Sequence, residues 1–151
     1  MRLFTFAALA AALLAALPSQ AQPSRSASPE KTLTASAEAA SVDIKAGGDD
    51  RNAVPGNGCS GFIDNRQPDA TVRAEGGGPL AIYATSGTDT TLLVADPEGR
   101  WHCSDDANGS NPAVTFADAR AGVYTVWVGT FSPEAAGASA RLHAVLGRPR
   151  W

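Results

Sequence analysis

The residue types best suited to chemistry gather in one short loop, 103–112, with the sequence CSDDANGSNP. Carboxylates, amides and hydroxyls follow one another closely there, and all of them offer oxygen atoms. Calcium takes six to eight oxygen ligands, and a turning loop can bring such oxygens together. The loop therefore predicts a calcium site. The candidate ligands are Asp105, Asp106, Asn108 and Asn111, with Asp89 and Asp96 as further carboxylates from neighbouring loops.

The same loop has a second interpretation, as a turn that binds no metal. Asp and Asn side chains often cap their own backbone, and Asn108-Gly109 is typical of a tight hairpin turn. The spacing also fits an EF-hand loop poorly. If Asp106 takes the third position of such a loop, Ser104 and Thr115 fall where strong ligands are required. Both interpretations stay open at this point.

Catalytic residues are harder to find. Ser60, His102 and Asp105 could be written as a triad, but the chain has no Gly-x-Ser-x-Gly motif to support a nucleophile. We therefore expect a protein that is not an enzyme, with a small exported hydrolase as an alternative. Trp101, Trp127 and Tyr83 could form a platform for a sugar or a peptide, but such residues more often pack in a core, and we expect core packing.

The beginning of the chain predicts export. Arg2 precedes an apolar run from Leu3 to Leu17, and the small residues of Ser19-Gln20-Ala21 are typical of a signal-peptide cleavage site. We expect residues 1–21 to be a signal peptide and the mature protein to be secreted or periplasmic. In that compartment two cysteines predict one disulfide, Cys59–Cys103.

The elements that would position these residues are strands. Apolar and polar residues alternate in short runs at 70–75, 80–85, 91–95, 100–103, 113–117, 123–131 and 140–146. Gly, Pro, Asn and Asp separate the runs, and no helical period is sustained. We expect an all-β domain over residues 58–147, a β-sandwich of about seven or eight strands with jelly-roll or Greek-key connections. Apolar residues on both faces of 123–131 predict a central strand.

Two flanking segments have a different composition. Residues 22–57 are rich in Ala, Ser and Pro and contain no aromatic residue, so we expect a flexible linker, with one marginal helix starting at Thr34 as an alternative. Residues 148–151 look like a frayed tail.

The order of the strand and turn motifs resembles the bacterial pre-peptidase C-terminal domain. The motifs are Ser86-Gly-Thr-Asp89, Asp96-Pro-Glu-Gly99, the loop from Asp105 to Gly109, and the strand Gly122–Val128. The resemblance implies a jelly-roll sandwich without catalytic residues that acts in adhesion, targeting or folding assistance. Some relatives bind calcium, and the Asp105-Asp106 pair matches that position. This chain departs from the family in having no peptidase domain and in carrying a cysteine pair.

The charge distribution limits the class of partner. Residues 58–147 contain ten Asp or Glu residues against five Arg and no Lys, so the basic surface that nucleic acid requires is missing. No later segment could span a membrane as a helix. We expect a binding or accessory module for an unidentified protein or polysaccharide. The alternative is a structural envelope or matrix protein that self-associates through its sheet edges.

Overall fold

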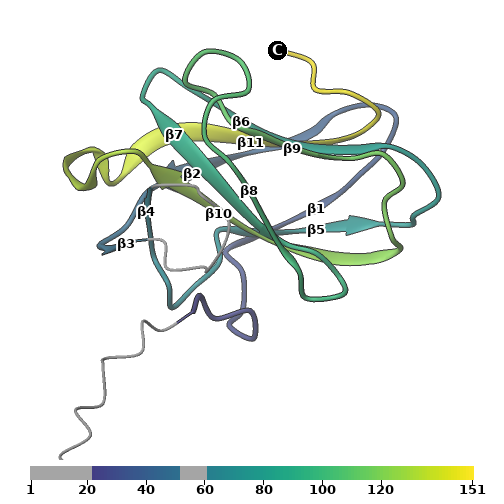
Figure 1. Ribbon diagram of the computed structural model, residues 1–151, viewed down its shortest axis with the longest axis horizontal. Coiled ribbons are helices and arrows are strands. Elements are labelled where there is room, and N and C mark those ends of the chain that lie inside the picture. Colours follow the sequence, from purple (N-terminus) through teal and green to yellow (C-terminus); the bar gives the residue numbers. More distant parts are fainter. Residues whose placement is uncertain (1–21, 52–60) are drawn as a thin grey trace, which may run out of the picture.

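The computed structural model describes residues 22–51 and 61–151, and these residues form an all-β structure. The described residues contain eleven strands in two sheets, one of seven strands and one of four. The sheets lie as two layers, with β6, β9 and β11 in one and β5 and β10 in the other (Figure 1). The expected β-sandwich is confirmed.

The strands of the larger sheet are β1 (Lys31–Thr34), β3 (Asp50–Arg51), β4 (Phe62–Ile63), β5 (Ala70–Ala74), β7 (Thr90–Ala95), β8 (Trp101–Ser104) and β10 (Gly122–Thr130). The strands of the smaller sheet, in spatial order, are β2 (Ala40–Ala46), β11 (Ala138–Leu146), β6 (Leu80–Ser86) and β9 (Ala113–Phe116). A 3-10 turn, Pro133–Ala135, precedes β11.

Alternation of side chains builds the core between the sheets. Val126 and Val128 of β10 face Ile82 of β6 and Leu142 of β11 in one buried cluster. The opposite face of β10 is also covered, because Trp127 is fully buried in a second cluster. β10 pairs with β5, β4 and β7. It is therefore the central strand that its sequence predicts.

All seven alternating runs named above form strands, from β5 to β11, with ends that differ by one or two residues. Residue alternation and turn chemistry are local signals, and they suffice where a strand carries several apolar residues.

The expected flexible linker is wrong for its described part. β1 pairs with β5 in parallel and β2 pairs with β11 antiparallel, so the segment contributes a strand to each sheet. An edge strand needs few apolar residues, and here Leu33 and Ile44 are buried while their neighbours are exposed. The low average hydrophobicity of residues 22–57 therefore gave no sign of these two strands. Ser36 forms a β-bridge with Val145, in place of the alternative helix.

The expected frayed tail is also wrong, because residues 148–151 pack against the smaller sheet. The hydroxyl of Tyr83 donates to the carbonyl oxygen of Arg150 at 3.0 Å, and the ring of Trp151 meets that of Tyr83 edge-on at 5.1 Å. Arg150 also donates from Nη2 to the carbonyl oxygen of Ala37. The tail therefore covers part of the outer face of the smaller sheet. The predicted signal peptide, residues 1–21, lies outside the described residues.

Candidate metal centre

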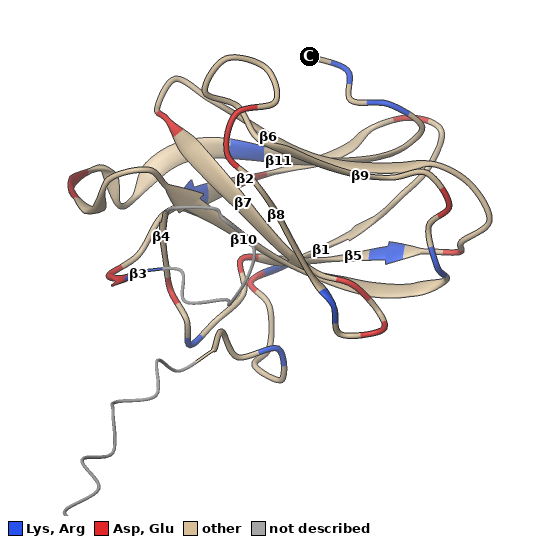
Figure 2. Cartoon of the chain, viewed as in Figure 1, with Lys and Arg blue, Asp and Glu red and all other residues tan. Residues whose placement is uncertain are grey.

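The hairpin of β7 and β8 positions the acidic loop. The two strands are antiparallel, with Leu92 opposite Ser104, so the start of β7 lies beside the end of β8. Asp89 immediately precedes β7, and Asp105 and Asp106 immediately follow β8. Figure 2 shows acidic segments at both places, on the same side of the molecule. The register of one hairpin thus brings together carboxylates that are far apart in sequence.

Three carboxylates meet at this point. Oxygen atoms of Asp89, Asp105 and Asp106 all lie within 4.8 Å of one another. Asp89 and Asp106 are exposed, and Asp105 is half-buried. We call these three residues the acidic triad.

The acidic triad lacks compensating charge. No ion pair among residues 22–51 and 61–151 includes any of the three aspartates. Burial raises the pKa of Asp105, and the negative charges of Asp106 and Asp89 raise it further. Oδ1 of Asp105 is buried and accepts no hydrogen bond. Desolvated carboxylate oxygens are costly without a partner, so the arrangement favours a cation among the three side chains.

The rest of the loop is anchored by hydrogen bonds. The backbone N–H of Asn108 donates to the carbonyl oxygen of Asn111 at 3.0 Å, and that of Asn111 donates back at 3.2 Å. Gly109 lies between them with φ of 58°, which favours glycine. The N–H of Thr90 donates to the carbonyl oxygen of Ser110 at 3.3 Å. The predicted tight turn therefore exists, and it lies next to the triad rather than replacing it.

Two of the sequence candidates have other partners. Oδ1 of Asn111 accepts the N–H of Ser86 at 2.8 Å and so joins the loop to the end of β6. Asn108 is exposed, and its backbone N–H and carbonyl oxygen take part in the turn.

Asp96 lies at the opposite end of β7 and does not join the triad. Its buried carboxylate accepts the N–H groups of Glu98 and Arg100, Nε of Arg100 at 2.8 Å and Nε2 of His102 at 2.9 Å. Burial opposes ionisation of this carboxyl, but the hydrogen bonds from His102 and Arg100 outweigh burial and lower its pKa to about 2. Asp96 therefore closes the β7–β8 turn as a structural ion pair.

Comparison with known proteins adds no family. No model of a known protein family and no curated protein matches this chain. The interpretation of the site therefore rests on the geometry of its own residues.

The aromatic residues pack as expected for a core. Trp127 is 0% exposed and Tyr83 is 1% exposed. Trp101 packs on Trp127 with ring centroids 5.5 Å apart, on the outer side of the larger sheet, whereas Tyr83 belongs to the smaller sheet. The three side chains therefore form no common platform.

The remaining sequence predictions involve residues outside the described parts of the chain. Cys103 lies on β8 opposite Leu93, but Cys59 and Ser60 fall in the segment 52–60. The Cys59–Cys103 disulfide stays a prediction. In the alternative hydrolase triad, His102 has Asp96 as its hydrogen-bond partner rather than Asp105.

Asp89 is the member of the triad that sequence reasoning ranked too low. The signal that identifies it is the turn Asp96-Pro-Glu-Gly99, which sets the register of the hairpin. Counting outward from that turn along both strands places position 90 opposite position 106. The same count places Asp96 at the other end of the hairpin, beside the turn.

Proposed function

We propose that this chain is an exported, non-catalytic β-sandwich binding module that calcium stabilises at the acidic triad. The observation that carries the proposal is the convergence of three carboxylates within 4.8 Å at one end of the β7–β8 hairpin. The binding partner is a protein or a polysaccharide outside the membrane. Among the described residues, no helix is long and apolar enough to cross a membrane.

The dimensions of the triad suit calcium. Calcium holds its oxygen ligands at about 2.3–2.6 Å, so two oxygens on one ion are at most about 5 Å apart. The 4.8 Å limit on the triad lies within that span. Two of the aspartates are exposed, which leaves room for water to complete a coordination shell of six to eight oxygens.

Both histidines have hydrogen-bond partners within the fold. Nε2 of His102 is hydrogen-bonded to Asp96 at 2.9 Å, and Nε2 of His143 to Oγ1 of Thr85 at 3.0 Å. His143 also stacks on Tyr83, with ring centroids 4.6 Å apart. Both imidazoles thus take part in structural contacts. The resemblance to the pre-peptidase C-terminal domain, whose members are accessory modules, agrees with this proposal.

Calorimetric titration of the folded chain with calcium tests the proposal. We expect a saturable heat signal for the wild-type protein. Asp105→Asn and Asp106→Asn should each weaken binding by about tenfold or more, because affinity follows the number of charged ligands. Asp118→Asn is the matched control: Asp118 is exposed and lies outside the triad. Absence of binding at millimolar calcium, or equal affinity in the Asp105→Asn, Asp106→Asn double variant, would refute the site.

A further inference from the structure

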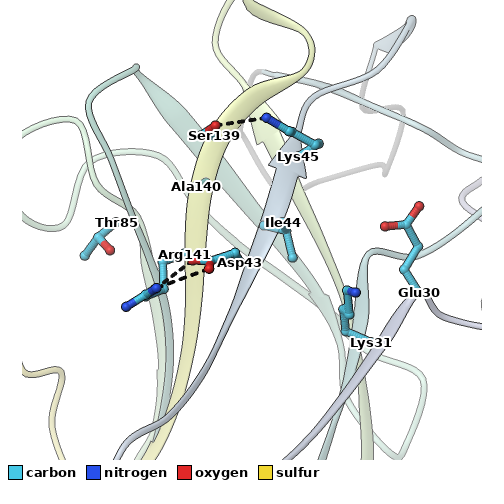
Figure 3. A pocket seen from close by; sticks show the side chains of 9 residues that line it. All are labelled: Glu30, Lys31, Asp43, Ile44, Lys45, Thr85, Ser139, Ala140 and Arg141. Atoms are coloured by element: carbon cyan, nitrogen blue, oxygen red, sulfur yellow. Dashed lines mark hydrogen bonds and ion pairs between the residues drawn. The ribbon is translucent and has the colours of Figure 1, made fainter.

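Strand β2 forms a free edge of the smaller sheet. It pairs with β11 on one side, and no described strand pairs with its other side. β2 has seven residues, whereas each of the other edge strands, β1, β3, β8 and β9, has four or fewer. A cleft lies beside β2, with Glu30 and Lys31 on its far side (Figure 3). The outer edge of β2 is therefore the longest unpaired edge in the described part of the chain.

The sequence of this edge does not prevent pairing with another strand. An unpaired edge presents a row of backbone N–H and C=O groups to any extended chain, and proline or a bulge often blocks it. β2 reads ASVDIKA and contains neither proline nor glycine. Its two charged side chains, Asp43 and Lys45, are the remaining feature that restricts a partner. Their arrangement therefore decides which strand fits.

Asp43 and Lys45 are exposed on the outer face of the sheet. Nε and Nη2 of Arg141 donate to the carboxylate of Asp43 at 2.8 Å and 3.2 Å. Nζ of Lys45 donates to the hydroxyl of Ser139 at 3.0 Å (Figure 3). Both partners belong to β11, and they use part of the bonding capacity of each group, because a carboxylate has about four acceptor sites and an ammonium group has three donors. Both charges can therefore also interact across the free edge.

An antiparallel second copy of β2 complements these charges in one register. There Asp43 lies opposite Lys45 of the second copy, and Lys45 lies opposite Asp43 of the second copy. Opposite side chains of antiparallel strands have Cβ atoms about 4.5–5.5 Å apart, which allows an ion pair. Ile44 then lies opposite its own copy, so an apolar pair separates the two ion pairs. Moving the symmetry axis by one residue, to Asp43 or to Lys45, places like charges opposite each other, which is unfavourable.

We propose that the outer edge of β2 binds β2 of a second copy of this chain and forms a symmetric dimer. The two four-stranded sheets then join into one continuous sheet across the pair of β2 strands. The charge pattern favours a second copy as the occupant, because each copy supplies the acid and the base that the other requires. Such a contact uses the same edge on both copies, so it stops at two. It shares no residue with the acidic triad and does not depend on the calcium proposal.

Sedimentation equilibrium of the folded chain at low ionic strength tests the proposal, at concentrations from about 1 μM to about 1 mM. We expect a monomer–dimer equilibrium with a Kd of about 100 μM or lower. Added salt should weaken the dimer, because salt screens ion pairs that water can reach. A chain that stays monomeric over the whole range would overturn the proposal.

Charge reversal tests the register. Asp43→Lys and Lys45→Asp each place like charges opposite each other and should each raise the Kd about tenfold or more. The double variant Asp43→Lys, Lys45→Asp restores opposite charges and should return the Kd to about the wild-type value. Asp118→Lys and Arg73→Asp are the matched controls, because they make the same changes of charge at exposed positions outside β2. Single variants that dimerise as the wild type does, or a double variant as weak as the single ones, would show that this pairing is wrong.

Hydrogen exchange locates the contact independently of its affinity. Backbone N–H groups of β2 that point away from β11 should exchange more slowly in concentrated than in dilute solution. β9 is the other edge of the same sheet, and its exchange should not depend on concentration. Slower exchange in β9 without a change in β2 would place the contact elsewhere and overturn the proposal.

Discussion

Asp69 is a partly buried carboxyl group with one hydrogen bond from the backbone. The N–H of Val128 donates to its Oδ2 at 2.7 Å. Burial nevertheless raises the pKa of Asp69 to about 7, and the charges of Glu30 and Asp64 contribute to the rise. The sequence could not predict this, because a single Asp before a strand gives no sign of the packing that covers it.

The raised pKa of Asp69 predicts a loss of stability with rising pH. A folded-state pKa above the unfolded value of 3.8 means that the folded state binds the proton more tightly. The stabilisation is complete below about pH 4 and is lost as the pH rises to about 7. Asp69→Asn removes the charge and keeps an acceptor for Val128. We expect this variant to be about 1–3 kcal/mol more stable than the wild type at pH 8.

Urea unfolding at pH 5 and pH 8 measures this difference. The exposed Asp118→Asn variant should follow the wild-type pH dependence. If Asp69→Asn loses as much stability between the two pH values as the wild type does, the charge of Asp69 does not cause the loss.

Asp96 shows the opposite behaviour at the other end of β7. Its side chain is 2% exposed, and its partners Arg100 and His102 hold it in the ionised form. Asp96→Ala leaves these donors and two backbone N–H groups without their acceptor. We expect it to cost about 2–4 kcal/mol at pH 7. Asp96→Asn keeps the size of the side chain and should cost less.

The lowered pKa of Asp96 gives a second check. Its contribution is present above about pH 4 and is lost as the pH falls towards 2. Chemical unfolding at pH 7 and pH 3 should therefore show a larger deficit for Asp96→Ala at pH 7. A deficit that is the same at both pH values would mean that packing, and not charge, accounts for the loss.

At the scale of elements, the sequence predicted strands well where a strand carries a full apolar face. The strands β6, β7 and β10 each bury several large residues, and β5 buries Val72 between two alanines in a regular two-residue period. The sequence did not predict β1 and β2, because each of them buries one large aliphatic residue, Leu33 or Ile44, next to small alanines. Composition averaged over the segment cannot detect such a pattern. A two-residue period with one large side chain per strand was the signal to seek.

Leu33 tests whether the segment 31–46 is part of the folded domain. Leu33 is 5% exposed and packs in the main core. We expect Leu33→Ala to destabilise the protein by about 2–4 kcal/mol. Thr34→Ser, at an exposed position of the same strand, should change stability by less than about 0.5 kcal/mol. Denaturant titration compares the two, and a neutral Leu33→Ala would restore the linker interpretation.

Elements also explain which parts of the candidate site were predictable. Asp105 and Asp106 are neighbours in sequence, so their proximity needs no tertiary information. Asp89 joins them because the hairpin register brings the start of β7 to the end of β8. The separation of Asp96 from them follows from the same register. The hydrogen bond from the N–H of Ser86 to Oδ1 of Asn111 joins the end of β6 to the acidic loop, and no local pattern predicts it.

At the scale of the whole molecule, the two sheets share one core, and the polar clusters lie at their margins. The acidic triad lies at one end of the larger sheet, in loops that connect strands. A cleft lies where the edge strands β1 and β2 of the two sheets meet. Loops and edges tolerate polar chemistry because the core does not depend on them. This division agrees with a binding module built on a stable scaffold.

The most direct test of the calcium proposal is the thermal unfolding of the chain with and without calcium. A cation that binds the folded state alone should stabilise it by about 2.7 kcal/mol when free calcium is 100-fold above its Kd. We predict a higher Tm with calcium for the wild type and for Asp118→Asn, and no rise for the Asp105→Asn, Asp106→Asn double variant. A wild-type Tm that millimolar calcium leaves unchanged, or a rise that persists in the double variant, would contradict the account.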